Sequence, residues 1–83
     1  MDLSTNLIHQ AKGFEGTISR IDGDQQLIRK LMSLGLRKGQ TISILHQRRN
    51  GVVVFSNGNR VALGANIARQ VYVEAASDSA KGA

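Results

Sequence analysis

Residues 41–63 read TISILHQRRNGVVVFSNGNRVAL, a stretch in which apolar and polar residues alternate around two Asn-Gly pairs. The pairs are Asn50-Gly51 and Asn57-Gly58. Asn and Gly both tolerate the positive φ angles that tight hairpin turns require. The stretch therefore predicts three antiparallel strands joined by two hairpins.

The apolar pattern constrains the register of these hairpins, since one face has to collect the core residues. Two-residue loops at both Asn-Gly pairs would place the Ile42/Ile44 face opposite to the face carrying Val54. A three-residue loop, Arg49 to Gly51, with Gly51 left-handed in a bulge, pairs residue 46 with 54 and 44 with 56. This register is preferred because it puts four residues on one face: Ile44, Val54, Val61 and Leu63.

The segment before the meander predicts a strand and a helix. Phe14, Ile18 and Ile21 alternate with polar residues as a half-buried strand whose phase shifts near its end. Asp22-Gly23-Asp24 then offers a carboxylate helix cap. Apolar residues follow at helical spacing: Leu27, Ile28, Leu31, Met32 and Leu34. Of these, Leu27, Leu31 and Leu34 are expected to face the core.

Gly35 predicts the end of this helix at about Leu34. Glycine readily takes the left-handed conformation that closes a helix in a Schellman motif, which would bring Leu36 within reach of Leu31. After the meander, residues 64–69 are expected to form a short link with one helical turn and Ile67 inward. Residues 71–73 are expected to form the last strand.

These elements predict a mainly β fold with one short helix. About five short strands close most economically as a small barrel with the helix over one end, and the pattern fits SH3-like and OB-like barrels equally. Residues 1–11 are expected to be a flexible segment, residues 12–75 the domain, and residues 76–83 a disordered tail.

Composition limits the possible functions. With 83 residues, 41% of them hydrophobic, the chain allows one small domain, and zero cysteines exclude disulfides and thiolate metal sites. We expect no signal peptide or membrane span. A formal net charge of +5 favours an acidic partner, whether nucleic acid, anionic lipid or protein.

The residues predict neither catalysis nor a metal site. His9 is expected to be solvated, and His46, placed on the Ile42/Ile44 face, to be a rim or partly buried structural histidine. No serine or threonine has a base that the sequence points to, and no phosphate-binding glycine motif occurs. A metal-chaperone function is disfavoured because ligands are lacking.

Several short motifs resemble the FeoA family of bacterial ferrous iron uptake. They are Lys12-Gly13-Phe14, Leu31-Met32-Ser33-Leu34-Gly35-Leu36 followed by Gly39, Arg60-Val61-Ala62-Leu63, and Val71-Tyr72-Val73-Glu74. The resemblance covers about residues 12 to 75. Two positions depart from the usual pattern: Lys38 stands where a proline is common, and Gly64 where a larger or basic residue is common.

The resemblance implies an SH3-like barrel and a non-enzymatic, cytoplasmic accessory protein without cofactors. It also implies docking on the cytosolic G-protein part of the transporter FeoB, and recruitment through FeoB to the inner face of the membrane. The chain is expected to act as a monomer, although exposed strand edges could also support oligomers.

The end of the helix is the expected docking surface. Met32 lies about 100° around the helix from Leu31, at the edge of the apolar stripe, and it combines there with the residues that follow the helix stop. The expected partner-binding residues are Arg29, Met32, Leu36, Arg37 and Lys38. The alternative is a small basic barrel that binds RNA or DNA. Barrels that bind single-stranded nucleic acid stack the bases on exposed aromatic side chains. Specific nucleic-acid binding is therefore not expected here, because two of the three aromatic residues, Phe14, Phe55 and Tyr72, are expected in the core.

Overall fold

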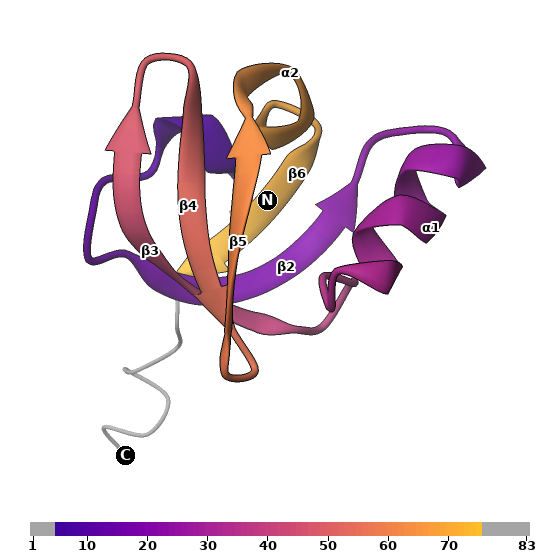
Figure 1. The fold of residues 1–83 in the computed structure, drawn as a ribbon, viewed down its shortest axis with the longest axis horizontal. Coiled ribbons are helices and arrows are strands. Elements are labelled where there is room, and N and C mark those ends of the chain that lie inside the picture. The colour runs from indigo at the N-terminus through magenta and orange to yellow at the C-terminus, as the bar shows by residue number, and fades with distance from the viewer. Residues whose placement is uncertain (1–4, 76–83) are drawn as a thin grey trace.

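The computed structural model describes residues 5–75, which form one six-stranded antiparallel sheet with a helix at its side (Figure 1). The strands follow the order β1-β6-β2-β3-β4-β5, so β1 and β5 are the two edges. The elements are β1 (Thr5–Asn6), η1 (Leu7–His9), β2 (Glu15–Ile21), α1 (Gln25–Ser33), β3 (Thr41–Arg48), β4 (Gly51–Ser56), β5 (Asn59–Gly64), α2 (Ala65–Ala68) and β6 (Val71–Ala75). Among these residues, the structure contains no helix long and apolar enough to cross a membrane.

The first residues described, which fall within the segment expected to be flexible at 1–11, pair with the sheet and contribute to the core. Thr5 and Asn6 pair with Val73 and Tyr72 of β6, and the Leu7 side chain is 1% exposed in the core. The Asn6 side chain also accepts a hydrogen bond from the Ile8 N–H at 3.1 Å and so caps η1. This strand was missed because two residues are too few to show a period. Residues 1–4 and the tail expected at 76–83 lie outside the described part of the chain.

The core collects the apolar side of the sheet, as expected. Ile44, Val54, Val61 and Leu63 are all buried and belong to the same cluster. The second turn is also as expected. Asn57 and Gly58 have φ angles of 52° and 84°, which are typical of a two-residue type I′ turn closed by the pair Ser56 and Asn59.

The first turn is different from the prediction. Arg48 pairs with Gly51, so the loop is the two residues Arg49 and Asn50, and Gly51 is a strand residue without a positive φ. With a two-residue loop alone, Ile44 and Val54 would lie on opposite faces of the sheet. An irregularity within β3 brings them to the same face. A β-bulge between Ile44 and His46 shifts the register by one residue, so that Ile44 faces Val54.

Gly51 is required by a close approach between strands. A Cβ at this position would lie 2.5 Å from the carbonyl oxygen of Leu63 on β5. The same bulge moves His46 off the Ile42/Ile44 face, where it was expected, to the outer side of the sheet, where it is exposed.

Helix α1 begins and ends at the residues that the sequence indicated. The Asp24 carboxylate accepts the Leu27 N–H at 2.9 Å, and Gly35 has a φ of +87°. The N–H groups of Leu36 and Gly35 donate to the carbonyls of Leu31 and Met32 at 2.8 and 2.9 Å, which are the two hydrogen bonds of a Schellman motif.

The motif exchanges the expected roles of two leucines. Leu34, expected in the core stripe, is 39% exposed, because it is the cap residue and has left the helical path. Leu36, expected on the docking surface, is 1% exposed, because the turn at Gly35 directs it back against the core. Helix α1 therefore anchors to the domain through Leu31 and Leu36, and projects to one side of the sheet (Figure 1).

Candidate docking surface

A groove of about 420 Å³ lies between α1, the end of β2 and the segment after the helix stop. We call it the α1 groove. It is lined by Arg20, Ile21, Ile28, Met32, Arg37 and Lys38. Three of these side chains are apolar and three are cationic, so the groove combines an apolar floor with a positively charged rim.

Met32 is the most exposed large apolar side chain of this groove, with 52% of its surface accessible. Its position follows from helix geometry, because it lies beside the buried Leu31 and one residue before the helix ends. Ile21 and Ile28 are only partly buried and flank it. An unbranched thioether side chain in such a place adapts to the shape of a partner.

The groove contains three of the five residues expected to bind a partner. Met32, Arg37 and Lys38 line it, whereas Arg29 is exposed on α1 and is not one of the lining residues. Leu36 is buried and cannot contact a partner. The expectation for Leu36 was wrong, because the reversal of the chain at Gly35 points it inward.

Arg20, Ile21 and Ile28 are groove residues that the sequence did not indicate as such. Arg20 and Ile21 end β2, which is separated from the helix stop along the chain, so only the tertiary fold joins them to Met32. The Arg20 guanidinium carbon lies 4.2 Å from the centre of the Tyr72 ring. This cation–π contact orients the side chain of Arg20, which is one of the lining residues of the groove.

The electrostatics of the groove reflect a charge imbalance in the chain. Residues 25–73 contain eight Lys or Arg residues and no Asp or Glu. They are Arg29, Lys30, Arg37, Lys38, Arg48, Arg49, Arg60 and Arg69. An acidic partner is therefore attracted to α1 and to the β3–β5 part of the sheet without opposing carboxylates from this segment.

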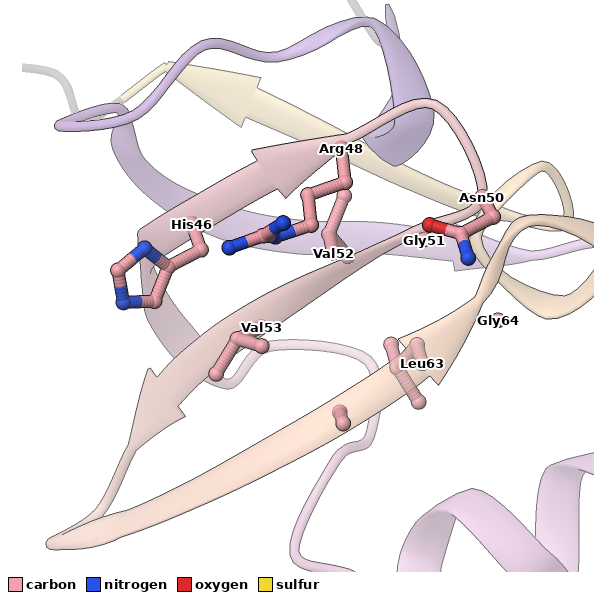
Figure 2. Close-up of a pocket in the computed structure, with 9 residues that line it drawn as sticks. His46, Arg48, Asn50, Gly51, Val52, Val53, Leu63 and Gly64 are labelled. Atoms are coloured by element: carbon pink, nitrogen blue, oxygen red, sulfur yellow. The ribbon is translucent and has the colours of Figure 1, made fainter.

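A second hollow, of about 250 Å³, lies on the outer face of β3, β4 and β5 (Figure 2). His46 and Arg48 extend from β3 on the side of the sheet that also carries Val53. Glycine occupies the adjacent positions 51 and 64, which pair with each other across β4 and β5. The missing side chains leave the sheet surface open at this row.

The described residues bring no metal-ligand cluster together. Within residues 5–75, no three His, Cys, Asp or Glu side chains form a group that could hold a metal ion. His9 is exposed in η1 and His46 is exposed in β3. The α1 groove itself presents apolar side chains and positive charge.

The aromatic residues differ from the expectation that two of them lie in the core. None of Phe14, Phe55 and Tyr72 is fully buried. Phe14 packs partly against the core cluster, while Phe55 is 41% exposed. Phe55 is opposite Ser43 and Arg60 in the sheet, so it lies on the outer face.

A family model and a curated relative indicate the same family. A family model described as the FeoA domain matches residues 6–75. A protein of Methanocaldococcus jannaschii that carries the name Fe(2+) transport protein A is 25% identical over 63 residues, which are 76% of this chain and 77% of that protein.

Similar solved structures include both a FeoA protein and a metal-dependent repressor. The crystal structure of an iron uptake regulatory protein (FeoA) matches with a TM-score of 0.81 and 30% identity, over 86% of this chain and 96% of that chain. A manganese-dependent transcriptional repressor in complex with manganese matches with a TM-score of 0.84 and 26% identity, over 92% of this chain but only 38% of the repressor chain. These matches confirm the expected fold class, a small, mainly β domain of the SH3-like type with a short helix.

Proposed function

The chain belongs to the FeoA domain family, and on this premise we propose that it is an accessory protein of ferrous iron transport that docks on the cytosolic part of the FeoB transporter through the α1 groove. The match to a family model over residues 6–75 supports the role in ferrous iron transport. The accessory role is one of binding, and it requires no catalytic residue.

One observation carries the choice of surface: Met32 is half exposed in a groove that also presents Arg37 and Lys38. An isolated small domain gains stability by burying its large apolar side chains, so a methionine left open in a concave place favours a contact with another molecule. The cationic rim adds attraction to an acidic surface and speeds the encounter.

The experiment is calorimetric titration of the chain into the purified cytosolic part of FeoB. We expect Arg37→Glu to weaken binding by about tenfold, since it places a carboxylate at the rim against an acidic partner. Met32→Asp should weaken it further, because it puts a charge on the apolar floor. Arg29→Glu is the matched control, as it reverses one charge on the same helix outside the groove lining.

Equal affinity of Arg37→Glu, Met32→Asp and the unmodified chain, with unchanged melting temperatures, would place the interface elsewhere. An equal loss in Arg29→Glu and Arg37→Glu would mean that the contact extends over the outer face of α1. A parallel titration with single-stranded RNA at physiological salt tests the alternative, nucleic-acid binding, for which we expect only weak and salt-sensitive affinity.

A further inference from the structure

Within residues 5–75, strand β5 is an edge of the sheet and pairs only with β4. We propose that the free edge of β5 binds an extended acidic segment of a partner protein as an added strand. This inference goes beyond the docking at the α1 groove and does not depend on it.

The pairing of β5 with β4 defines which backbone groups are free. In an antiparallel pair, alternate residues bond to the neighbour, and the residues between them point their N–H and C=O groups the other way. The Ala65 N–H donates to the Asn50 carbonyl at 2.9 Å, which extends the bonded series that begins at Asn59 beside the turn. The groups of Arg60 and Ala62, and the N–H of Gly64, therefore point to the free edge.

Exposed and buried residues alternate along β5 because successive side chains lie on opposite faces of the sheet. Arg60, Ala62 and Gly64 are exposed, while Val61 and Leu63, which lie between them, are 8% and 3% exposed. For a glycine, exposure means that the backbone itself is accessible. A Cβ built on Gly64 would meet no atom within 4 Å, so there is open space beside this end of the strand.

The edge carries one of the devices by which proteins usually protect such strands, the charged side chain of Arg60, and lacks others. β5 has no proline, and its pairing with β4 runs from Asn59 to Gly64 without a bulge. The other edge, β1, is only two residues long. A six-residue edge without a bulge, with open donors and acceptors, is the kind of template that strand addition uses.

The outer face next to this edge has room for side chains of an added strand. The hollow of about 250 Å³ is lined there by Ala62 and Gly64 of β5 and by Val53 of β4 (Figure 2). Side chains of the added strand that point to this face would lie over these small residues. This concave, directional site suits an extended peptide better than it suits a flat lipid surface.

Charge defines the chemistry of the occupant. Arg60 lies on the edge strand itself, and His46 and Arg48 lie on the same face of the sheet. Strands β3, β4 and β5 contain no Asp or Glu. A second copy of the chain would bring like charges together, whereas an acidic segment complements them.

The test is amide hydrogen exchange followed by nuclear magnetic resonance on the whole chain. The probe is a capped peptide of alternating Glu and Val, about eight residues and so roughly 26 Å long as a strand. We expect it to slow exchange of the Arg60, Ala62 and Gly64 amides, which are open in the free protein. The Val61 and Leu63 amides are protected from the start by β4 and serve as internal references.

Variants separate charge from shape. Arg60→Glu should weaken the Glu–Val peptide by about fivefold, and Gly64→Leu should weaken it by filling the hollow. Arg29→Glu, a charge reversal on α1, is the matched control and should leave peptide affinity unchanged. A peptide with Lys in place of Glu should not protect the edge amides.

Three results would overturn the proposal. The first is no protection of the three amides at peptide concentrations up to about 1 mM, or equal protection by the Lys peptide. The second is protection without peptide that increases with protein concentration, which would identify a second copy as the occupant. The third is a single-stranded oligonucleotide that shifts the Phe55 and Arg60 signals and prevents peptide binding, which would assign the face to nucleic acid.

Discussion

The Leu36 N–H donates to the Leu31 carbonyl at 2.8 Å, and the two side chains are 1% and 0% exposed. One backbone hydrogen bond thus joins the last turn of α1 to the core and turns the chain away from the helix axis. Met32, next to Leu31, stays outside the core because it lies on a different side of the helix. The same local motif anchors the helix and leads the chain into Arg37 and Lys38, which line the α1 groove.

Leu36→Ala should destabilise the fold by about 2–5 kcal/mol, because it removes a fully buried side chain and leaves a cavity. Met32→Ala should change the free energy of unfolding by less than about 0.5 kcal/mol, since that side chain is half exposed. Urea denaturation followed by circular dichroism measures both. Similar losses for the two variants would contradict the assignment of Leu36 to the core and Met32 to the surface.

Gly35→Ala should destabilise the fold by about 1–2 kcal/mol through backbone strain alone. The position has a φ of +87°, which disfavours any residue with a Cβ, although a Cβ there would meet no atom within 4 Å. Gly35→Asn should recover part of the loss, because asparagine tolerates the left-handed region. Thermal denaturation of the three proteins checks this order, and an alanine variant as stable as the unmodified chain would be inconsistent with the Schellman stop.

Gly51 and Gly64 face each other across β4 and β5 but should respond differently to alanine. Gly51→Ala should cost about 1–3 kcal/mol, because its Cβ would lie 2.5 Å from the Leu63 carbonyl oxygen. Gly64→Ala should stay within about 0.5 kcal/mol, because the added methyl group enters open space. Chemical denaturation of both variants, one the control of the other, measures the difference. A larger loss of stability at Gly64 than at Gly51 would contradict the observed packing of Gly51 against Leu63.

The isolated protein should have no stoichiometric, sub-micromolar Fe²⁺ site. High affinity needs several converging nitrogen, oxygen or sulfur ligands, and within residues 5–75 no three His, Cys, Asp or Glu side chains gather. Anaerobic calorimetry with Fe²⁺ measures this directly, with His46→Ala as the comparison. Tight one-to-one binding of Fe²⁺ that is abolished by His46→Ala would show that a site exists and would contradict this prediction.

The sequence by itself determined the features that depend on a few neighbouring residues. The carboxylate cap at Asp24, the helix stop at Gly35 and the turn at Asn57-Gly58 were all predictable, because capping geometry and the sign of φ are local properties. The alternation of apolar residues also indicated which of them share the core. The motifs around Gly35 were specific enough to indicate the family.

Only the tertiary structure decided the features that depend on contacts between distant segments. The loop at Arg49-Asn50 and the bulge before His46 could not be predicted, because a bulge in one strand corrects the phase as well as a longer turn does. A three-residue loop and a two-residue loop with a bulge in β3 both bury the same apolar face. In the structure, which has the second arrangement, Gly51 lies close to β5. The α1 groove likewise required the end of β2 to meet the end of α1, and the free edge of β5 required the order of all six strands. Such surfaces arise from long-range pairing, which a local pattern restricts but does not specify.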